Sequence, residues 1–131
     1  MIINLTQHAA TPDQIAAGVV DLPVDIRAEV ARALTFNELP EAEEIENRAF
    51  FLANIARKQV ILAGGDPETA HVMIGGAPWL MHPLEEALLD AGLWPVYAFS
   101  RRESVENVNA DGTVTKVNVF RHAGFVSAIC E

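Results

Sequence analysis

Residues 71–99 read HVMIGGAPWLMHPLEEALLDAGLWPVYAF, and this stretch decides the fold class. His71–Ile74 is a short, partly β-branched apolar run that ends in two glycines, as a strand does where it enters a turn. Pro78–Ala91 has apolar residues at helical spacing, and Pro95–Phe99 has the length and composition of a second strand. Strand, helix and strand in this order predict a βαβ crossover in which the two strands lie parallel.

The residues before this unit predict another strand and three helices. Ile2–Thr6 is β-branched and apolar, so we expect a strand inside the sheet. Residues 11–14, Thr-Pro-Asp-Gln, match a capping box at the start of a short helix. Asp25–Leu34 has the spacing of an amphipathic helix, and a longer amphipathic helix opens at Pro40.

The residues after the crossover predict a hairpin. Ser104–Asn109 and Thr113–Phe120 alternate around Asp111 and Gly112, a dipeptide that strongly favours a hairpin turn. We therefore expect residues 1–131 to form a single α/β domain, with a mixed sheet, helices packed on it and a C-terminal β-hairpin.

Composition argues against several classes of protein. The formal net charge of −9 repels a duplex phosphate backbone, so duplex DNA is not an expected partner. The apolar runs are far shorter than a membrane span and no export signal is recognisable, so no membrane contact is expected. Cys130 is the one cysteine and cannot form a disulfide within the chain, which suits a reducing cytoplasm.

The charges are unevenly distributed along the chain. Residues 1–94 contain five lysines and arginines against fourteen acids, whereas residues 95–131 contain four of each sign. An anion is attracted where basic side chains are not outnumbered. We therefore expect any anion site to use the C-terminal third.

The first candidate site is the Gly75–Gly76 turn, with Trp79 close behind it. Glycines between a strand's carboxyl end and a helix start let backbone N–H groups approach a phosphate, and the helix N-terminus adds partial positive charge. The pattern is neither a Walker A loop nor a dinucleotide fingerprint. The alternative is a tight turn that needs small residues for steric reasons alone.

The second candidate is residues 100–103, Ser-Arg-Arg-Glu, expected just past the carboxyl end of the Pro95–Phe99 strand. Ligands of open α/β sheets usually bind at such ends. The guanidinium groups of Arg101 and Arg102 match phosphate or carboxylate oxygens. The alternative is that these arginines pair with acids on the protein surface.

Two histidines are expected at strand ends. His122 follows Arg121 after the hairpin's second strand, and His8 follows Gln7 after the first strand of the chain. An imidazole there can act as a general base or donate to a phosphate near neutral pH, although most lone histidines do neither. No residues have the spacing of a metal site, so neither a metal nor a cofactor is expected.

Two segments resemble known families. His71–Phe99, with its glycine pair, Pro-Trp-Leu and Pro-Val-Tyr-Ala, is similar to the central unit of the small CRISPR-associated ring nucleases and related CARF-like domains. Ile2–Gln14 is similar to their first strand and the Thr-Pro-x-Gln helix start. The chain also resembles uncharacterised short proteins of bacteriophage and prophage genomes.

The resemblance implies a Rossmann-like protomer that dimerises and binds a cyclic oligoadenylate across the two-fold axis. In the nucleases a ribose 2′-hydroxyl attacks its own phosphate. By position, the resemblance places Gly75, Gly76 and Trp79 against phosphate and base. It leaves Arg101, Arg102 and His122 to stabilise charge.

We therefore expect a cytoplasmic homodimer that binds, and cleaves without a metal, a cyclic oligonucleotide or other nucleotide anion in antiviral defence. The alternatives are a protein that holds such a signal without cleaving it, and an acidic module that contacts a protein partner. The candidate catalytic residues are His8, Arg102 and His122. The candidate ligand-binding residues are Gln7, Gly75, Gly76, Trp79, Ser100, Arg101, Arg102 and Arg121.

Overall fold

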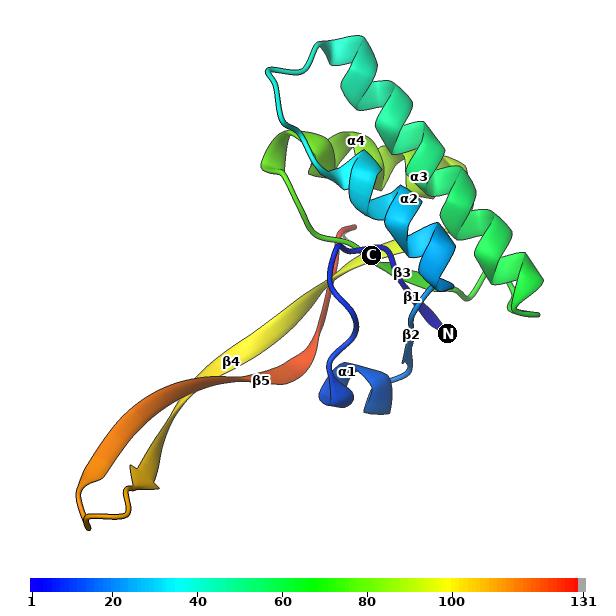
Figure 1. Ribbon diagram of the computed structural model, residues 1–131. Helices are drawn as coiled ribbons and strands as arrows, with labels where there is room; N and C mark the ends of the chain where they lie inside the picture. Colours follow the sequence, from blue (N-terminus) through cyan, green and yellow to red (C-terminus); the bar gives the residue numbers. More distant parts are fainter. Residues whose placement is uncertain (130–131) are drawn as a thin grey trace.

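The computed structural model describes residues 1–129, which form a sheet with helices on both faces (Figure 1). In chain order the elements are β1 (Ile2–Asn4), α1 (Pro12–Ala16), β2 (Val19–Val20), α2 (Val24–Leu34), α3 (Ala42–Leu62), β3 (His71–Met73), α4 (Pro78–Asp90), β4 (Trp94–Val108) and β5 (Val114–Ser127). No helix in this part of the chain has the length and apolarity needed to cross a membrane.

The five strands lie in the order β2-β1-β3-β4-β5. β1 pairs in parallel with β2 and β3, β3 pairs in parallel with β4, and β5 pairs antiparallel with β4. The predicted fold class is confirmed: the sheet is mixed, helices pack on it, and the last two strands form a hairpin. β1 lies inside the sheet, as predicted, because a strand flanks it on each side.

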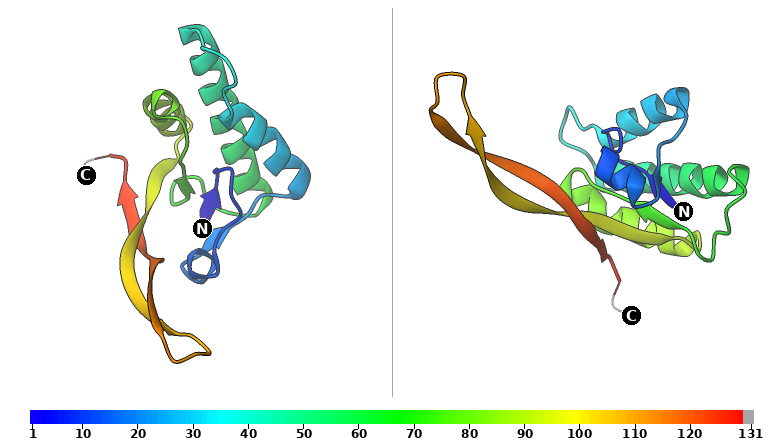
Figure 2. Two further views of the ribbon diagram at one scale, coloured as in Figure 1. Left: turned by 60° about the vertical axis from the view of Figure 1, so that its left-hand side comes forward. Right: turned by 90° about the horizontal axis from the view of Figure 1, so that it is seen from below.

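Helices α2, α3 and α4 cover one face of the sheet and build the main core with it (Figure 2). Alternate strand residues such as Ile3 and Val72 point into this core, where period-two alternation places every second side chain. Leu52 of α3 and Leu84 of α4 meet them and are fully buried. Leu5 and Ile74, the first residues after β1 and β3, are buried in the same core, so the loops that follow start from fixed positions.

The short helix α1 lies on the side of the smaller cluster, in which Val19, Met73 and Val96 are buried and Phe125 packs against them. The predicted capping box opens α1: Thr11 is the N-cap and Pro12 occupies the first turn. Strand β2 was not predicted, because its two residues are too few to show an alternating pattern.

Strands β4 and β5 extend beyond the rest of the sheet as a two-stranded ribbon (Figures 1 and 2). At the start of the ribbon Phe99 pairs with Gly124 and Ser100 pairs with His122, so Ala123 is an extra residue in β5. Such a bulge bends and twists a strand. We call residues 100–122 the arm and the other described residues the body.

The prediction of two separate strands at Pro95–Phe99 and Ser104–Asn109 is wrong, because β4 runs without a break from Trp94 to Val108. Residues 100–103, expected just past the carboxyl end of the Pro95–Phe99 strand, belong to β4. In a ribbon whose two faces are open, polar and charged side chains can lie on either face, and pairing with β5 keeps the backbone extended. The predicted turn at Asp111 and Gly112 is confirmed.

Candidate functional site

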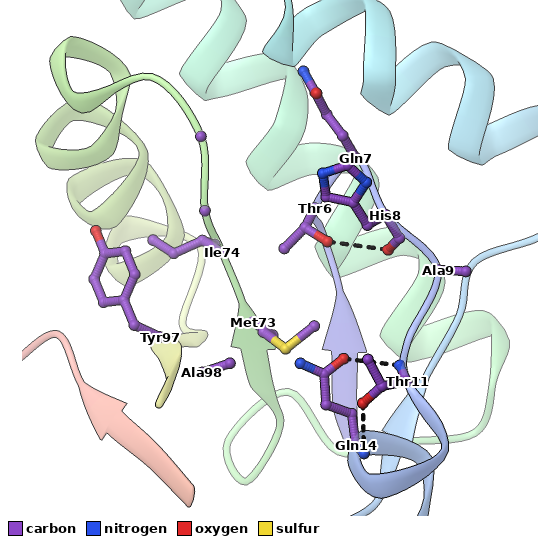
Figure 3. Close-up of a pocket in the computed structure, with 12 residues that line it drawn as sticks. Thr6, Gln7, His8, Ala9, Thr11, Gln14, Met73, Ile74, Tyr97 and Ala98 are labelled. Carbon is purple, nitrogen blue, oxygen red and sulfur yellow. Dashed lines mark hydrogen bonds between the residues drawn. The ribbon is translucent and has the colours of Figure 1, made fainter. Parts of the chain in front are cut away.

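A cleft of about 610 Å³ lies at the carboxyl ends of β1 and β3, beside Tyr97 and Ala98 of β4 (Figure 3). This edge of an open parallel sheet is where α/β proteins usually bind ligands. Its lining residues are Thr6, Gln7, His8, Ala9, Thr11, Gln14, Met73, Ile74, Gly75, Gly76, Tyr97 and Ala98. Of the predicted site residues the cleft therefore brings together Gln7, His8, Gly75 and Gly76.

Asn4, buried at the end of β1, shapes the loop that forms one wall of the cleft. Its amide nitrogen donates to the His8 carbonyl oxygen and to Asp21 Oδ1, at 2.8 Å each. Its side-chain oxygen accepts from the backbone N–H of Thr6 at 3.0 Å and from the Thr6 hydroxyl at 2.7 Å. Asp21 in turn accepts from the Ala10 N–H at 3.0 Å. A fully bonded buried amide of this kind holds the loop in one conformation.

The first turn of α1 supplies a second wall. The Thr11 hydroxyl accepts from the Gln14 N–H at 3.2 Å, and the Gln14 side-chain oxygen accepts from the Thr11 N–H at 3.0 Å. These bonds occupy the amide oxygen of Gln14, whose amide nitrogen lies on the other side (Figure 3). Gln7 is anchored in a different direction, because its amide nitrogen donates to the Thr35 hydroxyl at 3.0 Å.

The Gly75–Gly76 turn forms the opposite wall. Gly76 has a φ of 150°, which favours glycine. At Gly75 a β-carbon would lie 3.8 Å from Thr6 Cγ2, an ordinary contact, so this glycine is not required by crowding. Within residues 1–129 neither backbone N–H of the pair donates to a protein atom. The turn therefore offers two donors beside the start of α4.

Tyr97 closes the end of the cleft at β4. Its hydroxyl donates to Glu85 Oε2 on α4 at 2.8 Å. Burial, and secondly this hydrogen bond and the charge of Glu85, raise the pKa of the Tyr97 hydroxyl. The phenol therefore stays protonated at neutral pH. Its one proton is donated to Glu85, and this hydrogen bond holds the ring in position at the cleft.

The other predicted site residues lie elsewhere. Trp79 packs edge-on against Phe36, with ring centroids 5.6 Å apart, and lines a separate cavity beside residues 36–40. Ser100, Arg101 and Arg102 lie within β4, and Arg121 and His122 lie within β5. The expectation that these five residues follow strand ends is wrong, because both strands continue through them. Their part in binding a ligand stays a prediction.

His122 has an unusual environment on the arm. Its ring packs against Phe125 with centroids 4.7 Å apart, and its buried Nδ1 has no hydrogen-bond partner among residues 1–129. Among residues 1–129 no three His, Cys, Asp or Glu side chains are arranged to hold a metal ion. Cys130 lies outside the described residues.

The fold and the cleft define an α/β protein with a ligand-sized cleft at the carboxyl edge of its parallel strands. The chain belongs to the Uncharacterized protein MJ1673 family, whose profile matches residues 1–126. No curated protein and no solved structure matches it significantly. The match spans both body and arm, so the arm is part of the family's domain.

Proposed function

We propose that the cleft binds a nucleotide anion, specifically a cyclic oligonucleotide. The observation that carries this proposal is that Gly75 and Gly76 line the cleft and that neither of their N–H groups has an acceptor among residues 1–129. They lie between the carboxyl end of β3 and the first turn of α4. Backbone donors at a helix start are a common means of binding phosphate oxygens.

The chemistry of the lining supports a nucleotide over a small inorganic ion. Among the described residues no lysine, arginine, aspartate or glutamate lines the cleft. The hydroxyl of Thr11 and the amide of Gln14 line the cleft together with an apolar floor, Met73 and Ile74. Uncharged hydrogen-bonding groups with an apolar floor suit a base and a ribose, and the glycine turn suits the phosphate.

His8 is the group in the cleft that suits proton transfer near neutral pH. We propose that it removes the proton of a ribose 2′-hydroxyl as that oxygen attacks the neighbouring phosphorus. The bond from phosphorus to the 5′-oxygen breaks, which leaves a 2′,3′-cyclic phosphate and a 5′-hydroxyl that takes its proton from water. No metal takes part in this step.

Binding is tested with the full chain and a panel of cyclic oligoadenylates of different ring size, with linear oligoadenylate as control. A ligand that binds the native state raises the melting temperature. Gly75→Val adds bulk beside Thr6 at a position that tolerates a β-carbon, so we expect a normal melting temperature without ligand and no rise with it. A wild-type chain that responds to no ring, or a variant that still responds, contradicts the proposed site.

Cleavage is tested separately, by following the products of the ring that binds best. We expect His8→Ala to retain the ligand-induced shift and to lose product formation, because His8 is exposed and its carbonyl, which Asn4 holds, remains. Arg102→Ala and His122→Ala test the arm residues in the same assay. Tight binding by the wild type without products would show a protein that sequesters the signal.

A further inference from the structure

The arm has two open faces and two open edges. The pairing of β3 with β4 ends at Val96, and beyond the bulge β4 and β5 pair only with each other among the described strands. Large apolar side chains lie on it, including Val117 and Phe120, which are 40% and 70% exposed. An isolated two-stranded hairpin is marginally stable in water, so we expect another protein surface to pack against a ribbon of this length.

One face of the arm has a charge imbalance. Arg101 lies directly opposite Arg121 in the β4–β5 register, and like charges in that position destabilise a hairpin. Glu103 neutralises only one of these two charges, because its carboxylate accepts a hydrogen bond from Arg121 Nε at 2.7 Å. In the described part of the chain Arg101 forms no ion pair. Val105, paired with Val117, lies on the same face. The face is therefore apolar in part, and it has two arginines but only one carboxylate, that of Glu103.

The body has the opposite imbalance. The body contains five lysines and arginines against fourteen acids, whereas the arm contains four against three. A groove of about 840 Å³ between α3 and α4 concentrates this charge. Glu46, Glu86 and Asp90 line it, together with Arg57 and His82. Arg57 is already engaged, since it donates to the Ala91 carbonyl oxygen.

We propose that the arm docks in the α3–α4 groove of a second copy of this chain, so that Arg101 and Arg121 face Glu86 and Asp90. Alternation along β4 puts Arg101 on the same face as Tyr97, and Tyr97 contacts α4. The docking face of the arm and the helices therefore lie on the same side of the sheet. A two-fold axis then brings each arm over the helices of the other copy, in two equivalent contacts.

Charge complementarity is the reason for choosing a second copy over a nucleic acid. The basic patch is small, the arm also carries Glu103, Glu106 and Asp111, and the whole chain has a net charge of −9. A long polyanion would extend over the acidic body and be repelled by it. The acidic α3–α4 groove of a second copy would contact only the basic side chains of the arm. The proposed dimer needs no ligand in the cleft. A monomeric protein would therefore contradict this inference without contradicting the proposed function.

The experiment is sedimentation of the full chain over a range of concentrations. We expect wild type to form dimers at micromolar concentration and Arg101→Glu to weaken dimerisation at least tenfold. The ribbon should persist in that variant, because the new acid lies opposite Arg121. Arg102→Glu is the matched control, because it makes the same charge change at the adjacent residue, on the other face of the arm. The Arg102→Glu variant should dimerise more tightly than the Arg101→Glu variant.

A charge swap identifies the surface that accepts the arm. Glu86→Lys with Asp90→Lys in one chain should also dissociate the dimer, and mixing that chain with Arg101→Glu should restore a heterodimer. The inference is overturned by a monomeric wild type, by equal effects of Arg101→Glu and Arg102→Glu, or by no recovery on mixing. It is also overturned if the wild type is monomeric and binds single-stranded RNA through Arg101.

Discussion

The body and the arm are stabilised by different means. In the body, side chains from strands and helices are buried together, and Leu52, Leu80 and Leu84 have no exposed surface. In the arm, the backbone ladder of β4 and β5 is the main support, and most side chains on both faces are exposed. The body therefore sets the geometry of the cleft, while the arm leaves its side chains free to contact a partner.

The largest effect that separates the two regions is a truncation in the core. Leu84→Ala removes a fully buried side chain from α4, and we expect it to lower the free energy of unfolding by about 2–5 kcal/mol. Val114→Ala on the arm should change it by less than about 0.5 kcal/mol, because Val114 is exposed near the hairpin turn. Urea unfolding of both variants at one protein concentration measures the difference. Similar losses would contradict the division into body and arm.

The sequence predicted the body well because burial leaves a periodic pattern there. The helical spacing in Asp25–Leu34 and the strand, turn and helix of residues 71–91 correspond to α2, β3 and α4. In the arm there is no core to impose such a pattern. A polar run such as residues 100–103 is therefore equally consistent with a loop and with a solvent-exposed strand, and the structure shows the strand.

The candidate site divides in the same way. Gln7, His8, Gly75 and Gly76 were found because they follow body strands whose ends could be predicted. Asn4, Asp21 and Tyr97 were missed. A polar residue inside the apolar run Ile-Ile-Asn-Leu was the available signal for Asn4, but its partner Asp21 lies seventeen residues away and no local pattern joins them.

The next effect concerns the glycine turn, where the two glycines should respond differently. Gly76→Val forces a branched side chain to adopt a φ of 150°, so we expect a loss of about 1–3 kcal/mol in the free energy of unfolding. Gly75→Ala is the control, since its methyl group meets only an ordinary contact with Thr6. Thermal unfolding of both variants measures the difference. A Gly76→Val chain as stable as wild type would show that the turn can take another conformation.

A smaller, pH-dependent effect is expected where the body meets the base of the arm. Because burial and Glu85 raise the pKa of Tyr97 above its ordinary value of 10.0, the unfolded chain loses this proton first as pH rises. The stabilisation is thus complete below about pH 10 and declines above it. Tyr97→Phe should cost about 1 kcal/mol at neutral pH through the lost hydrogen bond, and should be less sensitive to alkali.

This effect can be measured directly, because Tyr97 is the only tyrosine of the chain. Ultraviolet absorbance of the phenolate follows its titration in the folded protein, and urea unfolding at several alkaline pH values follows the stability. If wild type and Tyr97→Phe lose stability in parallel above pH 10, the hydroxyl does not titrate as the geometry requires.

The smallest effect lies on the arm, where Glu103 pairs with Arg121 at 2.7 Å between side chains that are 40% and 58% exposed. An exposed ion pair usually contributes about 0.2–1 kcal/mol, so in the monomer, at concentrations too low for the proposed dimer, Glu103→Gln should lower the free energy of unfolding by no more than that. The loss should lie toward the upper end at low salt, because the variant leaves Arg101 and Arg121 opposite each other without a carboxylate. Salt screens such exposed charges, so wild type and variant should converge as salt is added. Urea unfolding at low and high salt measures both values, and a loss that exceeds about 2 kcal/mol and persists in high salt would mean that this face of the arm is buried more deeply than its exposure in one chain indicates.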